Sequence, residues 1–174
     1  MHKSIPSFYE LICEIAESED FCKMQQIRHH VHSTTYEHSL KVAFLCYRYY
    51  CRHKSKVELR ELIRGALLHD YYLYDHHSRE ANGLIGIGHT LTHPKRALAN
   101  AREAYRDLTR SEQDAIRRHM FPLTLLPPST RCGWLVCYYD KVAAIGDYFN
   151  RTAWKQDPEW QRAVHALEAH RAKV

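Results

Sequence analysis

Apolar and polar positions along most of the chain repeat with the period of an α-helix. Apolar residues recur three and four positions apart, so that each helix would present one apolar stripe to a core. No convincing alternation of apolar and polar residues, as expected for a strand, competes with this pattern. The pattern predicts helices at residues 7–17, 36–53, 57–74, 94–108, 111–120, 129–148 and 158–172. We therefore expect an all-α fold.

Helix-breaking and helix-starting residues lie between these segments. Glycines at 83–88 indicate a loop, and Pro94 suits a first helical position, where no amide donor is needed. His93 is then expected at the N-cap, where free backbone amides favour an anion such as phosphate. Ser111 with Asp114 three positions later resembles a helix start.

The length and composition are those of one folded domain. A chain of 174 residues can bury a single core, so we expect one domain over residues 1–174. Apolar residues at 45% and charged residues at 26% are typical of soluble globular proteins. No run approaches the roughly 18 apolar residues of a membrane span, and the first residues lack the pattern of a signal peptide. These features predict a cytoplasmic protein without a membrane partner.

Charge and metal-binding residue types narrow the chemistry. The six cysteines form no CxxC pair, which excludes a zinc ribbon and a thioredoxin-type motif and predicts reduced core residues. The net charge of +5 is modest and dispersed, so nucleic acid is not expected as an obligate partner, whereas an anionic small substrate is compatible. Fourteen histidines are unusual, because imidazole both titrates near neutral pH and ligates metals.

Two carboxylates interrupt apolar stripes. Helical spacing places Asp70 on the stripe that contains Ile63 and Leu67, and Asp140 within the apolar face of the 129–148 helix. A carboxylate on a buried face costs several kcal/mol unless it is paired or bound to a metal. Both residues therefore need partners.

Several histidines fall on the same inward faces. His38 lies one turn before Val42, and His119 continues the stripe of Ala115 and Ile116. Imidazoles and carboxylates from different helices form transition-metal sites in helical bundles. Any one of these histidines alone is also compatible with a hydrogen-bonded core residue. Together the inward groups suffice for two ions; they are His38, His69, Asp70, His93, His119 and Asp140.

Three short strings resemble the H…HD…D motif of HD-domain hydrolases. They are EHSLKVA at 37–43, GALLHD at 65–70 and YDK at 139–141, and the resemblance extends from about His38 to Asp147. His93 and His119 resemble the added histidines of dinuclear members, which include HD-GYP cyclic dinucleotide phosphodiesterases and a bacterial diadenosine tetraphosphate hydrolase family. The whole chain is most similar to small bacterial HD proteins, which implies a helical HD bundle with a core over about 36–148.

The resemblance implies a ligand set and a reaction. One divalent ion would bind His38, His69, Asp70 and Asp140, and a second would bind Asp70 as a bridge together with His93 and His119. The ions would be Fe, Mn, Zn, Ni or Mg. Two ions would activate a bridging hydroxide against a phosphorylated, nucleotide-like substrate that contains a phosphodiester or phosphoanhydride.

Charged residues beside these ligands in sequence complete the expected site. Asp70 and Lys141 are the expected catalytic residues, and Lys41, Lys95 and Arg96 are candidates for substrate phosphates. Asp147, on the same helical face as Asp140, is expected to support a ligand.

The sequence also departs from one subgroup. In HD-GYP enzymes an Ile-Gly-Lys sequence follows HD, whereas here residues 71–73 read Tyr-Tyr-Leu, and the GYP element is missing after His119. Cyclic di-GMP is therefore disfavoured as the substrate. Two other functions stay open: a mononuclear nucleoside monophosphate 5′-phosphatase, and a non-catalytic, metal-containing module that binds nucleotides. The sequence also leaves a monomer and a homodimer open.

Overall fold

The computed structural model describes residues 4–30, 33–53, 55–74, 87–149 and 152–173, and these are predominantly helical. Within them lie α1 (Phe8–Ala16), α2 (Glu19–Lys23), α3 (Thr35–His53), α4 (Leu59–Leu68), α5 (Ile87–Ala104), α6 (Arg110–Arg118), α7 (Arg131–Tyr148) and α8 (Pro158–Arg171). Two 3₁₀ helices, η1 (Met24–Gln26) and η3 (Ala153–Gln156), and two short strands, β1 (Arg28–His30) and β2 (Ser33–Thr34), complete the described elements. The expected all-α fold is confirmed.

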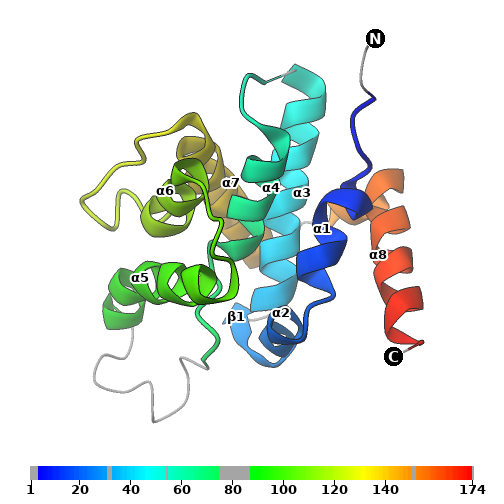
Figure 1. Cartoon of the computed structure of the whole chain (residues 1–174), viewed down its shortest axis with the longest axis horizontal. Coiled ribbons are helices and arrows are strands. Elements are labelled where there is room, and N and C mark those ends of the chain that lie inside the picture. Colours follow the sequence, from blue (N-terminus) through cyan, green and yellow to red (C-terminus); the bar gives the residue numbers. More distant parts are fainter. Residues whose placement is uncertain (1–3, 31–32, 54, 75–86, 150–151, 174) are drawn as a thin grey trace.

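The helices form a bundle around α3. This helix packs against α4 and α7, and α6 packs against both α4 and α7. In Figure 1, α1 and α8 lie together on one side of these central helices, and α5 and α6 lie on the other. The core between them contains fully buried residues from four helices, including Ile12, Phe44, Leu62, Leu67 and Ile116. Among the described residues, no helix is both long enough and apolar enough to cross a membrane.

The cysteines are reduced, as the absence of CxxC pairs predicts. All six are free thiols. Cys46, Cys132 and Cys137 are buried, and the other three are half-buried.

Two predicted helix starts are wrong. Helix α5 begins at Ile87, so Pro94 lies inside it and His93 is not an N-cap residue. Proline removes one hydrogen bond to the preceding turn, a cost that the burial of His93, Ala97 and Ala101 on one face outweighs. Helix α6 starts earlier than Ser111, at a capping box in which Thr109 and Glu112 bond each other's backbone amides.

One further boundary and one hairpin differ from the sequence pattern. Helix α4 ends at Leu68 and not at residue 74, because the chain turns through Asp70 and reaches a left-handed conformation at Leu73, with φ of 54°. The β1–β2 hairpin was not predicted, since strands of two or three residues are too short to show alternation. This hairpin delivers the chain to the start of α3.

Asp114 connects α6 to the beginning of α7. Its carboxylate accepts hydrogen bonds from the backbone amides and the hydroxyls of Ser129 and Thr130, at 2.8–3.2 Å. Although burial opposes the charged form, these bonds hold the pKa of Asp114 below its usual value. The stabilisation is therefore present above the ordinary pKa of an aspartate and is lost as the pH falls through the lower, folded-state value.

We expect Asp114→Ala to lower the free energy of unfolding at pH 7 by about 2–4 kcal/mol, because it leaves several half-buried donors without an acceptor. Urea denaturation of the variant and the parent protein measures this difference. Asp107→Ala, which removes an exposed carboxylate bonded to Arg64, is the control and should cost less than about 1 kcal/mol. Equal losses in the two variants would contradict the structural role of Asp114.

Candidate metal centre

The six predicted ligands come together at the centre of the bundle, although they arise from five helices or their ends. His38 lies in the first turns of α3, His93 in α5 and Asp140 in α7. His69 and His119 occupy the C-cap positions of α4 and α6. All six are buried, and none is more than 8% exposed.

Asp70 lies between two groups of histidines. Its Oδ2 atom is 3.4 Å from His69 Nε2, whereas its Oδ1 atom is 3.2 Å from His93 Nε2 and 3.4 Å from His119 Nε2. The Nε2 atoms of His93 and His119 are 2.9 Å apart. On the other side, Asp140 Oδ1 is 3.0 Å from His38 Nε2 and 3.6 Å from His69 Nε2. One carboxylate thus connects two clusters of donor atoms.

Backbone carbonyls fix the orientation of two of these imidazoles. His69 Nδ1 donates to the carbonyl of Ala66 at 2.7 Å, and His119 Nδ1 donates to that of Ile116 at 2.9 Å. A carbonyl can only accept, so the proton lies on Nδ1 in each ring. In the neutral ring Nε2 then carries a lone pair, and this atom faces the carboxylates. Metal-binding histidines are commonly oriented in this way.

The donor atoms fit a divalent cation. His69 Nε2 and Asp70 Oδ1 are buried without a hydrogen-bond partner among the described residues. Ligand atoms about 2.1 Å from an ion are about 3.0–3.4 Å apart at angles between octahedral and tetrahedral, close to the separations found here. The donor atoms of His38, His69 and Asp140 all lie within 4.8 Å of one another. The same holds for the donor atoms of His69, Asp70 and His119. Lone pairs directed at carboxylate oxygens repel each other unless a cation lies between them.

Comparison with family models decides the assignment. The model described as HD domain matches residues 35–145, nearly two thirds of the chain and the segment that holds all six residues. The chain belongs to the HD-domain family. This superfamily consists of metal-dependent phosphohydrolases, and its members are generally hydrolases. No curated protein and no solved structure matches the chain.

The charges in this HD domain compensate one another. Although burial opposes ionisation, the neighbouring His69 and the hydrogen bond with His29 keep the pKa of Asp70 well below its usual range. Burial disfavours the charged form of His38, but hydrogen bonds to Asp140 and Asp147 raise its pKa to about 9. Burial lowers the pKa of His119 to about 4, so this imidazole is neutral at pH 7 and available as a ligand.

The two nitrogens of His38 face two different carboxylates. Nε2 faces Asp140, and Nδ1 faces Asp147. Asp147 Oδ2 accepts from His38 Nδ1 at 3.3 Å, which matches the supporting role expected for this residue. Lys41 is buried, and its ammonium donates to Asp147 Oδ1 at 2.5 Å and to the carbonyl of Ala143 at 3.0 Å. The structure therefore commits Lys41 to Asp147, whereas the sequence made it a candidate for substrate phosphates.

The other three charged candidates lie closer to solvent. Lys141 Nζ donates to Asp140 Oδ2 at 3.1 Å and to the carbonyl of His119. Its charge therefore lies beside both halves of the candidate metal centre. Lys95 and Arg96 are exposed on α5, two and three residues after His93. The Arg96 guanidinium lies 4.8 Å from the centre of the Tyr74 ring. Neither residue is at a helix N-terminus.

A cavity of about 490 Å³ borders the candidate metal centre at His38 and Asp147. It lies between α3, α7, η3 and α8, and its lining includes His38, Lys41, Asp147, Trp154 and Arg171. The remaining five predicted ligands do not line it.

Sequence reasoning missed His29. Its Nε2 atom lies 2.9 Å from Asp70 Oδ2, and its ring stacks on that of His38. His29 belongs to a short strand and is followed by His30 and by a further histidine at 32, so no periodicity distinguishes it from its neighbours. The contact of His29 with Asp70 is visible only in the tertiary structure.

Proposed function

We propose that this HD-domain protein is a dinuclear phosphohydrolase that cleaves a nucleotide-like phosphodiester or phosphoanhydride. The position of Asp70 carries the proposal: one oxygen faces His69, and the other faces His93 and His119. A carboxylate between two sets of imidazoles is suited to bridging two ions. The nitrogen-rich ligand set favours iron, manganese, zinc or nickel over magnesium.

When bound, two such ions would lower the pKa of a water molecule and neutralise charge on the phosphoryl oxygens. The chain's own residues would hold this arrangement. Asp70 would fix the spacing of the two halves, and the backbone bonds of His69 and His119 would keep their Nε2 atoms directed inward. Lys141 would add positive charge beside Asp140, where a substrate phosphate gains stabilisation.

Two alternatives make different demands on the same residues. A mononuclear monophosphatase needs only His38, His69, Asp70 and Asp140, and it gives no role to the close approach of His93 and His119. A metal-containing regulatory module would bind nucleotides without hydrolysis. The 2.9 Å between His93 Nε2 and His119 Nε2, both close to Asp70 Oδ1, supports a second ion over the mononuclear alternative, whereas only turnover distinguishes the regulatory module.

Metal content and turnover test the proposal together. Protein purified without chelator and without a metal-binding tag should contain, or take up from Mn²⁺, about two ions per chain. It should hydrolyse bis(p-nitrophenyl) phosphate or a dinucleoside polyphosphate faster than a nucleoside monophosphate. One ion with turnover of monoesters alone would favour the mononuclear alternative, and nucleotide affinity without turnover would favour the regulatory module. Consistent absence of metal uptake would exclude all three.

Lys95 and Arg96 provide a test of the substrate class. Their charges lie on the exposed side of the helix that contains His93, where they would hold a phosphate other than the scissile one. Replacing both with alanine should raise KM for a substrate with several phosphates about tenfold and leave kcat nearly unchanged, as expected for loss of uniform binding.

Steady-state kinetics with a dinucleoside polyphosphate and with p-nitrophenyl phosphate would measure this effect. The small monoester should be processed as by the parent protein. Arg102→Ala, which removes an exposed charge nearer the end of the same helix, is the matched control. A double variant that treats every substrate like the parent protein would remove this phosphate site.

A further inference from the structure

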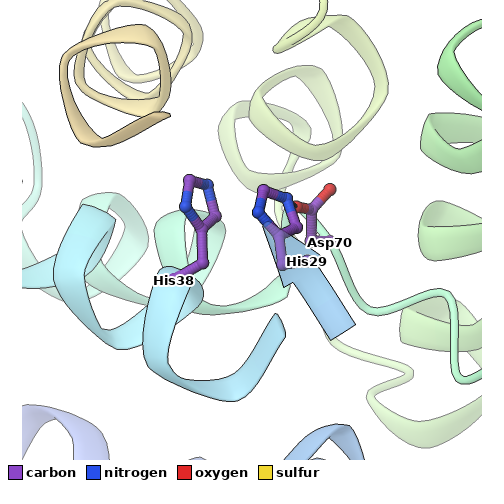
Figure 2. Close-up of side chains that lie close together, drawn as sticks. All are labelled: His29, His38 and Asp70. Atoms are coloured by element: carbon purple, nitrogen blue, oxygen red, sulfur yellow. Dashed lines mark hydrogen bonds and ion pairs between the residues drawn. The ribbon is translucent and has the colours of Figure 1, made fainter. Parts of the chain in front are cut away.

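His29 lies within the metal centre, although it precedes the family-matched segment. Figure 2 shows its ring, carried by β1, between His38 of α3 and the carboxylate of Asp70. The His29 and His38 rings are nearly parallel, with centroids 3.9 Å apart and an interplanar angle of 17°. The side chain of His29 is only 15% exposed.

The distances place His29 with one half of the centre. Its Nε2 atom is 2.9 Å from Asp70 Oδ2, the oxygen that also faces His69 Nε2 at 3.4 Å. Donor atoms of His29, His38 and Asp70 all lie within 4.8 Å of one another. A separation of about 3.0 Å is that of two ligand atoms at right angles around an ion with bonds of about 2.1 Å.

We infer that His29 is a fifth protein ligand of the first ion, beside His38, His69, Asp70 and Asp140. This inference rests on the metal centre of the proposed function and adds a residue that the H…HD…H…H…D pattern does not contain. The 2.9 Å between His29 Nε2 and Asp70 Oδ2 carries the inference, and the stacking of the His29 ring on that of His38 holds His29 beside these ligands.

The hairpin holds His29 in place before any ion binds. Strand β1 pairs with β2, and the amide of Thr35 donates to the carbonyl of Ile27 at 2.9 Å. The Thr35 hydroxyl lies 3.3 Å from the same carbonyl, and Ser33 Oγ lies 3.5 Å from Asp147 Oδ2. These bonds tie the strand that carries His29 to the start of α3 and to α7. A ligand fixed in this way loses little conformational entropy when the ion binds.

The consequence is an asymmetric pair of sites. Among the described residues, five would nearly complete the shell of the first ion, whereas Asp70, His93 and His119 would leave the second with open positions. The first site should therefore bind metal more tightly, and the water and the substrate phosphate should enter mainly at the second.

Cobalt binding tests the inference without an activity assay. Metal-free protein is titrated with Co²⁺ against a competing chelator, and the visible absorption of the first equivalent is recorded. His29→Ala should weaken binding of the first Co²⁺ equivalent about 100-fold or more, because loss of a residue that only hydrogen-bonds a ligand costs about 10–100-fold in metal affinity. It should also change the absorption spectrum of the bound Co²⁺. His165→Ala, an exposed histidine on α8, should match the parent protein.

Two variants of equal size separate a ligand from a hydrogen-bond donor. His29→Glu supplies a carboxylate ligand, whereas His29→Gln can donate to Asp70 but is a poor ligand. Recovery of Co²⁺ affinity in His29→Glu and not in His29→Gln supports the inference. Full recovery of affinity and spectrum in His29→Gln would show that His29 only positions Asp70 and would overturn it. This comparison holds even if His29→Ala does not fold.

A further control separates this inference from the proposed function. His69→Ala removes a ligand of the first site and should lose the first equivalent of Co²⁺. If His69→Ala loses the ion while His29→Ala binds it with parent affinity and spectrum, His29 is not a ligand. If both variants bind Co²⁺ like the parent protein, the proposed metal centre itself is wrong.

Discussion

Asp70→Ala is expected to abolish hydrolysis of every substrate, with kcat reduced at least about a thousandfold. The substitution removes a carboxylate that faces both halves of the centre, and loss of an outer-shell partner alone already costs about 10–100-fold. Both metal equivalents should bind more weakly. Turnover of bis(p-nitrophenyl) phosphate and metal content after dialysis measure the two effects.

Asp147→Ala is a suitable comparison for Asp70→Ala, because this carboxylate contacts His38 Nδ1 and does not face the histidines of the second site. Asp147→Ala should weaken metal binding about 10–100-fold, as expected for loss of a residue that supports a ligand, and should retain measurable turnover. If Asp70→Ala keeps both ions and a rate within tenfold of the parent protein, Asp70 is not a bridging ligand and the proposed mechanism is excluded.

His119→Ala is expected to reduce the metal content from two ions to one per chain. His119 Nε2 faces Asp70 Oδ1 at 3.4 Å and His93 Nε2 at 2.9 Å, and among the described residues it belongs to the proposed site with fewer protein ligands. The first equivalent should bind almost as in the parent protein. Diester hydrolysis should fall at least about 100-fold, because the open coordination positions are on this side.

Elemental analysis after dialysis, together with diester turnover, measures this outcome. His69→Ala is the matched control, because it should weaken the first equivalent of metal instead. The melting temperature shows how much of the loss is a folding effect, since any substitution of a buried imidazole leaves a cavity. If metal content and rate are both unchanged, His119 is a core histidine and the dinuclear proposal fails.

The sequence alone determined the fold class and the unusual character of the inward polar residues. Helical periodicity depends only on local spacing, and it predicted most of the helices within a few residues. Asp70 and Asp140 stood out because a carboxylate on an apolar stripe needs compensation, whatever the tertiary arrangement. The HD-type motif was likewise visible in the sequence, and the family comparison confirmed the family.

Local signals failed where tertiary packing competed with them. Pro94 indicated a helix start, yet the burial of His93 and Ala97 against the bundle extends α5 back to Ile87. Lys41 was expected to meet phosphate, because its position beside a ligand in sequence does not show which way its side chain points. In the structure it is buried against Asp147, on the outer side of His38.

Only the tertiary structure decided which side chains from different helices and strands contact one another. The division of the two Asp70 oxygens between His69 on one side and His93 and His119 on the other depends on the packing of α4, α5 and α6. The entry of His29 depends on a two-stranded hairpin with no sequence periodicity. Helical spacing fixes which face of one helix a residue occupies, but the distance between side chains of different helices is set by how those helices pack.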